Sequence, residues 1–245
     1  MQGMRAVRNE AYREIRRNDQ GRSTTQQTGL LLQPVKEVSV IIQSLVVGPI
    51  QANCFILGCE QTKEAAVIDP GDEVKRILGG LQKHGLQLKY IINTHGHFDH
   101  VGGNKGLKEK TGAPILIHQA DAPMLAQLSS SAAVWGMHVD DSPPPDQYLK
   151  DGDKVTFGEI TLEVIHTPGH SLGGVSLYTP KDLFVGDTLF AGSIGRTDFP
   201  GGDYDQLISG VRKRLFVLGD DVRVFPGHGP ATTIGQEKRY NPFFQ

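Results

Sequence analysis

The strongest constraint on this chain is a run of four potential metal ligands within six residues. The run is Thr94-His95-Gly96-His97-Phe98-Asp99-His100, and it directly follows the apolar stretch from Leu88 to Ile92. Side chains two residues apart in an extended segment point to the same side, so the first two histidines can bind one cation. The aspartate and the last histidine then face a second cation. Two glycines after the run allow a tight turn into a following helix.

Three later segments offer further ligands, each in a turn that follows a strand-like run. They are Val164 to His170, Leu183 to Asp187, and Val222 to Gly229. Most histidines in proteins are solvated or satisfied by one hydrogen bond, and two of them alone would mean little. A cluster supported by three separate turns is better explained by a site for two metal ions, because imidazole and carboxylate groups suit zinc, manganese or iron.

The order of these motifs, T-H-x-H-x-D-H, T-P-G-H, G-D-T and P-G-H-G, resembles the metallo-β-lactamase superfamily over about residues 38 to 245. The stretch from Gly186 to Asp203 and the tail from Ile234 to Phe243 are similar to the short glyoxalase II-like branch. Its Gly-Arg-Thr-Asp-Phe run also occurs in the persulfide dioxygenase branch.

The resemblance implies an α/β fold of the four-layer αββα sandwich type and a set of seven ligands. The first metal would be held by His95, His97 and His170, the second by Asp99, His100 and His228, and Asp187 would bridge them. We expect two divalent ions, zinc in the first place, with iron or manganese as alternatives.

The resemblance also implies the chemistry. Between two cations a water loses its proton near neutral pH, and the resulting hydroxide is the nucleophile that attacks a thioester carbonyl. Asp99 is the expected catalytic carboxylate, which either takes the remaining proton or only orients the hydroxide. Arg196 either contacts a substrate carboxylate or pairs with Asp198.

Two enzyme functions are therefore expected as alternatives. The first is a metal-dependent thioester hydrolase, similar to hydroxyacylglutathione hydrolase, with a small-molecule substrate. Classical glyoxalase II carries a C-terminal helical domain that helps to bind glutathione, whereas only 17 residues follow His228 in this chain. The second is a persulfide dioxygenase with one iron at His95, His170 and Asp187. A β-lactamase, a nuclease or a metal-binding protein without turnover stays open from the superfamily alone.

Periodicity predicts two similar β-rich halves that pack sheet on sheet. The first half has strands at 38–47, 53–57 and 65–68 and a helix at 74–84; the second has strands at 154–157, 160–166, 175–178 and 183–185 and a helix at 204–218. Asp69 ends a strand and either accepts hydrogen bonds from the ligand loop or only forms a turn before Pro70. The stretch from Ser129 to Lys150 is expected to be irregular, as a substrate-facing lid or a solvated loop.

Composition sets the remaining expectations. One hydrolase domain is expected at 38–245 and a disordered extension at 1–37, although its six arginines leave an organelle transit peptide conceivable. The net charge of -2 gives no reason to expect nucleic acid, and no apolar run is long enough to span a membrane. Cys54 and Cys59 are five residues apart and should face opposite sides of one strand, which argues against a disulfide and for a cytoplasmic setting. The oligomeric state stays open.

Overall fold

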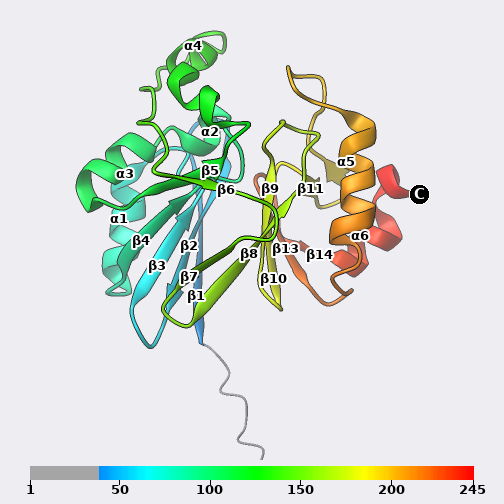
Figure 1. The fold of residues 1–245 in the computed structure, drawn as a ribbon, viewed down its shortest axis with the longest axis horizontal. Helices are drawn as coiled ribbons and strands as arrows, with labels where there is room; N and C mark the ends of the chain where they lie inside the picture. Colours follow the sequence, from blue (N-terminus) through cyan, green and yellow to red (C-terminus); the bar gives the residue numbers. More distant parts are fainter. Residues whose placement is uncertain (1–38) are drawn as a thin grey trace, which may run out of the picture. The chain divides into compact units, whose positions relative to one another are not determined.

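The structure is a computed structural model, and it describes residues 39–245, so the predicted extension at 1–37 lies outside the described residues. Its first half is a six-stranded sheet in the order β1-β2-β3-β4-β5-β6 (Figure 1). The strands are β1 Val40–Val47, β2 Ala52–Cys59, β3 Glu64–Ile68, β4 Gln87–Ile92, β5 Ile115–His118 and β6 Gln147–Leu149. Four α-helices accompany them: α1 Val74–Lys83, α2 Phe98–Val101, α3 Asn104–Thr111 and α4 Leu128–Ala133, the last preceded by a 3₁₀ helix over Ala122–Gln127.

The second half is also built on a six-stranded sheet, in the order β14-β13-β10-β9-β8-β7. Its strands are β7 Lys154–Phe157, β8 Ile160–His166, β9 Val175–Tyr178, β10 Asp182–Gly186, β13 Arg223–Pro226 and β14 Thr232–Thr233. A short hairpin of β11 Leu189–Phe190 and β12 Ser193–Ile194 lies beside it, with the helices α5 Tyr204–Gly210 and α6 Ile234–Tyr240. None of the helices in residues 39–245 is long and apolar enough to cross a membrane.

Strand β2 shows why the first sheet is covered on both faces, since all of its residues are buried. Successive side chains alternate between faces, so Cys54 and Ile56 pack with α1 to α4, while Phe55, Leu57 and Cys59 pack against the second sheet. The two cysteines therefore belong to different cores, and both are free thiols. This confirms the prediction that they form no disulfide with each other.

The core between the sheets is centred on three aromatic rings. Phe184 of β10 is fully buried, and its ring lies 5.2 Å from that of Phe55 and 4.9 Å from that of Phe225. A third core forms on the far side of the second sheet, where Leu183 and Val185 pack with α5 and α6. Helices thus cover both outer faces (Figure 1), which confirms the four-layer αββα sandwich.

Two segments differ from the sequence-based predictions. The stretch 129–150 is not irregular throughout, because it begins inside α4 and ends with β6. Leu128 and Ala132 lie one turn apart and are both buried, which gives the short helix α4 an apolar side. The helix predicted at 204–218 is α-helical only to Gly210 and continues as a wider π-helical turn over Val211–Leu215.

Parallel pairing determines where the polar turns meet. Strands β3, β4 and β5 are parallel neighbours in the first sheet, and β10 and β13 are parallel neighbours in the second. The carboxyl ends of parallel strands lie at the same edge of a sheet, which is the usual place for a ligand site in α/β proteins. The turns after these five strands therefore face one another.

The inter-sheet core gives the first testable prediction. Replacing Phe184 with Ala should lower the free energy of unfolding by about 3–5 kcal/mol, because it leaves a cavity between two sheets that close around the ring. Urea denaturation followed by circular dichroism measures this change. Val217→Ala is the matched control, since that side chain is 71% exposed. A loss below about 1 kcal/mol for Phe184→Ala would contradict the described packing.

Candidate metal centre

All seven residues predicted as metal ligands lie together at the carboxyl ends of the strands. His95, His97, Asp99 and His100 follow β4, while His170 follows β8, Asp187 follows β10 and His228 follows β13. The first four belong to one half of the sandwich and the other three to the second half. The centre therefore forms only where the two halves meet.

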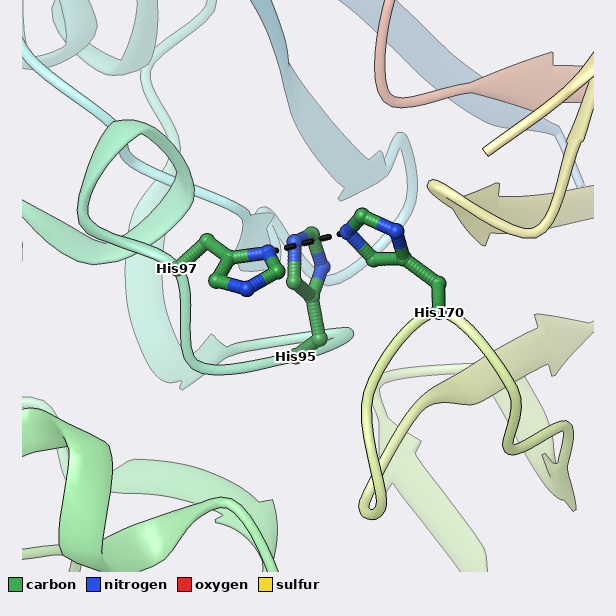
Figure 2. Close-up of side chains that lie close together, drawn as sticks. All are labelled: His95, His97 and His170. Atoms are coloured by element: carbon green, nitrogen blue, oxygen red, sulfur yellow. Dashed lines mark hydrogen bonds between the residues drawn. The ribbon is translucent and has the colours of Figure 1, made fainter. Parts of the chain in front are cut away.

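The first group is His95, His97 and His170, whose ligand atoms all lie within 4.8 Å of one another. Figure 2 shows that the first two come from one loop and the third from another, with their rings close together. His97 Nδ1 is 2.9 Å from His170 Nε2. Ligands of a tetrahedral zinc ion at 2.0–2.1 Å would be separated by about 3.3 Å, so this spacing is close to what a metal requires.

The second group is Asp99, His100 and His228. His228 Nε2 lies 3.2 Å from Asp99 Oδ2 and 3.2 Å from His100 Nε2. His100 is completely buried, and the other two side chains are partly exposed. This group thus combines one carboxylate and two imidazoles around one point, where Asp99 and His228 are partly accessible to solvent.

Asp187 lies between the two groups. Its Oδ2 is 3.6 Å from His170 Nε2 in the first group and 3.6 Å from His228 Nε2 in the second. A Cβ atom at position 227 would lie only 2.1 Å from Asp187 Oδ1, so the glycine there is required by the close approach of this carboxylate. The position of Asp187 suits a group that bridges two ions.

Two buried polar atoms of the centre lack any hydrogen-bond partner among the described residues. They are Nε2 of His95 and Oδ1 of Asp187. A buried polar atom without a partner costs about 1–3 kcal/mol, and such atoms are rare in folded proteins. Both belong to the predicted ligand set, so the donor set fits bound metal ions.

The hydrogen bonds on the far side of the rings fix which nitrogen faces the centre. Thr94 donates its hydroxyl proton to Asp69 Oδ2 at 2.6 Å, so its oxygen accepts from His95 Nδ1 at 3.0 Å. His100 Nδ1 donates to Asp69 Oδ2 at 3.2 Å. In both rings Nε2 is left for a metal, as is usual for metal-binding histidines.

Asp69 is therefore more than a turn residue. It also accepts from the backbone N–H of Thr94 at 2.7 Å, and it is 1% exposed. The prediction that this carboxylate accepts hydrogen bonds from the ligand loop is confirmed. A third group of potential ligands, Asp69 with His95 and His100, uses the same carboxylate, whose two oxygens already accept these bonds.

The local charges act in opposite directions on the two groups of histidines. Burial and neighbouring imidazoles lower the pKa of His95, and they lower the pKa of His97 to about 4. Burial also opposes the charged form of His100, but Asp187, Asp99 and Asp69 outweigh it and raise the pKa of His100 to about 10. His228 has a raised pKa because the hydrogen bond to Asp99 and the charge of Asp187 outweigh its burial. His95 and His97 are thus neutral at pH 7. His100 is protonated on both ring nitrogens, and a metal must displace the proton on Nε2.

Arg196 lies at the edge of the first group, and its backbone and side chain play different parts. Its carbonyl accepts from His170 Nδ1 at 2.7 Å, which again leaves Nε2 for a metal. Its guanidinium makes two 2.7 Å bonds to Asp198 and lies 3.8 Å above the ring of Phe199, which is 5.4 Å from the ring of His97. The predicted pairing with Asp198 is confirmed.

Sequence reasoning missed two buried residues that hold the ligand loops. Asn53 donates from Nδ2 to the carbonyls of Pro226 and Gly229, both at 2.9 Å, and so fixes the turn that carries His228. Asp121 follows β5 and accepts hydrogen bonds from Gly96 and from the loop after His170. The signal that the sequence offered was a carboxylate shortly after the apolar run from Ile115 to Ile117. The remaining histidines, at positions 84, 118, 138 and 166, lie outside the three groups of potential ligands.

A cavity of about 200 Å³ borders Asp99. Its apolar lining comes from the end of β1 and the turn after it, from α2 and from the segment that follows α4: Val47, Pro49, Ile50, Phe98, Met137 and Val139. Asp72 and His138 add polar groups. Part of the stretch 129–150 therefore lines a cavity that reaches the second ligand group at Asp99.

The sequence matches the profile of the metallo-beta-lactamase superfamily over residues 47–228. It is 40% identical over 206 residues to a protein of Haemophilus influenzae named hydroxyacylglutathione hydrolase GloC. The aligned region covers 82% of this chain and 97% of that relative.

Three solved structures are also similar. The B3 metallo-beta-lactamase BLEG-1 has 36% identity and a TM-score of 0.79, with 84% of this chain and 100% of the other covered. TTHA1623, solved in a di-iron-bound form, has 40% identity and a TM-score of 0.76, with 82% and 99% covered. ETHE1 from Myxococcus xanthus has 29% identity and a TM-score of 0.71, with 82% and 83% covered.

These matches extend over most of the chain and include every loop of the centre. The profile runs from the end of β1 to His228, the last of the predicted ligands. By sequence and by fold, this chain belongs to the metallo-beta-lactamase superfamily.

Proposed function

We propose that this protein is a thioester hydrolase similar to hydroxyacylglutathione hydrolase, with a two-metal centre. The observation that supports it most strongly is the pair of ligand groups joined by Asp187, which lies 3.6 Å from a ring nitrogen of each group. The first metal is held by His95, His97 and His170, and the second by Asp99, His100 and His228. The name of the 40% identical relative supports the substrate class. Zinc is the first candidate metal, and the di-iron form of TTHA1623 keeps iron in consideration.

The residues of the centre divide the work between holding the metals and guiding the reaction. When bound, two divalent cations supply a hydroxide near neutral pH and polarise the substrate carbonyl. Asp99 lies in the second group and borders the cavity, so its carboxylate can orient the nucleophile toward a substrate bound there. Burial alone would raise the pKa of Asp99, but the neighbouring imidazoles hold it well below its usual range. Its carboxylate is thus ionised and accepts a hydrogen bond.

The surroundings of the centre suit a small acyl thioester. The apolar cavity beside Asp99 has room for a short acyl or thiol chain. Arg196, about half exposed at the rim, is the proposed contact for a substrate carboxylate and would exchange Asp198 for it. We also propose the cytoplasm as the place of action, because both cysteines are free thiols.

The second candidate function is the persulfide dioxygenase, which the similarity to ETHE1 favours. One iron at His95, His170 and Asp187 would suffice for it. A single iron at that position would not use Asp99, His100 and His228 as ligands. The ligand atoms of these three side chains nevertheless lie within 4.8 Å of one another, as those of the first group do. The intact second group is the reason for preferring the hydrolase.

Replacing Asp187 with Ala tests the bridge. The variant should bind less metal, and its kcat/KM for lactoylglutathione should fall by at least about 100-fold, because both ions lose a shared ligand. Metal content by elemental analysis and the rate of thioester hydrolysis are the measurements. Asp220→Ala is the control, since this exposed carboxylate forms its ion pair with Lys238 and belongs to none of the ligand groups. Wild-type metal content and rate in Asp187→Ala would refute the two-metal proposal.

Replacing His228 with Ala separates the two candidate functions. The hydrolase should lose its second ion and most of its thioester hydrolysis, because His228 belongs only to the second group. The iron-loaded parent protein should consume no oxygen above background with glutathione persulfide. Oxygen uptake equal to the persulfide consumed, and unchanged in His228→Ala, would instead support the dioxygenase.

The opposed pKa shifts predict different pH dependences for the two metals. In His95→Ala/His97→Ala, where only the second group keeps all of its ligands, the metal must displace the proton held by His100, whose pKa is about 10. Metal affinity should therefore fall at least about tenfold for each unit from pH 8 to pH 6. In His228→Ala, where the first group is left, the metal affinity should change much less between pH 8 and pH 6, because the pKa of His97 is about 4. Chelator competition at three pH values measures both, and equal slopes would contradict the prediction.

A further inference from the structure

Asp121 is a buried carboxylate at which the two halves of the metal centre are joined. It follows β5 and is 1% exposed. Its Oδ2 accepts from the backbone N–H of Gly96 at 3.0 Å and from the hydroxyl of Ser171 at 2.7 Å. Its Oδ1 accepts from the backbone N–H of Gly173 at 2.6 Å. All three donors lie in the loops that carry the first group of ligands.

The positions of the donors give these bonds their significance. Gly96 stands between His95 and His97 in the first half, and Ser171 directly follows His170 in the second half. The three histidines of the first group thus come from two loops with no covalent link nearby, and one carboxylate accepts from both loops. A Cβ atom at position 173 would lie 2.7 Å from Asp121 Oδ1, so only glycine allows this close contact.

Asp121 differs from Asp69 in how it acts. Asp69 bonds to the ring of His100 and to Thr94, so it contacts a ligand side chain directly. The bonds made by Asp121 go to two backbone N–H groups and one hydroxyl, all of which are neutral donors. The bonds from Gly96 and Ser171 share one acceptor atom, Oδ2. They fix the distance between the loops rather than the orientation of a ring.

We propose that Asp121 is a positioning residue for the first metal, which holds the loop of His95 and His97 against the loop of His170. This inference rests on the proposed two-metal function. It gives the two buried carboxylates different tasks: Asp121 joins the two loops of the first group across the halves, whereas Asp69 orients the ring of His100 directly and that of His95 through Thr94. Loss of Asp121 should therefore lower the affinity for the first metal ion and leave the affinity for the second unchanged.

The test measures Co²⁺ affinity by chelator competition, together with the visible absorption of the bound ion. Asp121→Asn keeps the size of the side chain but turns an amide N–H toward one of its donors. In a His228→Ala background, which leaves only the first group, it should raise the Kd for Co²⁺ by about 10- to 100-fold and change the absorption bands. In a His95→Ala/His97→Ala background, where only the second group keeps all of its ligands, the Kd should stay unchanged.

Two further variants keep the result interpretable. Asp146→Asn is the matched control, because this carboxylate accepts from the N–H of Ile115 at the other end of β5 and contacts no ligand loop; it should change neither Kd. Ser171→Ala removes one of the three donors and should raise the first-group Kd for Co²⁺ by a smaller factor. If Asp121→Asn does not fold, this variant tests the positioning role instead.

The outcomes distinguish a failure of the positioning role from a failure of the proposed two-metal function. An unchanged first-group Kd, or equal losses in both backgrounds, would overturn the positioning role of Asp121. If the wild type bound fewer than two Co²⁺ ions, the proposed two-metal function would fail and this inference with it. Selective loss of the first ion in Asp121→Asn and Ser171→Ala supports the assignment.

Discussion

The packing of one sheet on the other is the constraint on which the metal centre depends. Each half supplies only part of the ligand set, so neither half could bind two metals alone. The rings of Phe55, Phe184 and Phe225 contact one another inside the buried core that joins the two sheets. Close-packed interiors resist small displacements, so such a core can hold ligands from separate halves in one geometry.

The centre concentrates polar groups where burial makes them costly. Five imidazole and carboxylate groups of the ligand set are less than one-fifth exposed, and two of their atoms have no partner among the described residues. Asp69 and Asp121 lie behind the ligands and accept hydrogen bonds from the loops that carry them. In a two-metal centre, bound cations offset the burial of charge, and these two carboxylates keep the loops in place.

Much of the fold and the centre could be predicted from the sequence, because period-2 strands and metal-binding turns are local signals. The apolar run of β2, the alternation of buried and exposed residues in β7, and the order of ligand motifs are of this kind. Asp121 could not be predicted in the same way, because its role depends on the parallel pairing of β4 and β5, which periodicity does not report. Helix α4 was missed because its apolar signal comes from only two residues, Leu128 and Ala132. Contacts between distant segments, such as Asn53 with the turn of His228, are likewise tertiary.

The central claim is that two metal ions lie side by side between the halves of the sandwich. Anomalous diffraction from crystals of the metal-loaded protein, collected at the absorption edge of the bound metal, tests it most directly. Two peaks are expected about 3.5–4 Å apart, one beside His95, His97 and His170 and one beside Asp99, His100 and His228, with Asp187 between them. A single peak beside His95, His170 and Asp187 at full metal loading would contradict the claim.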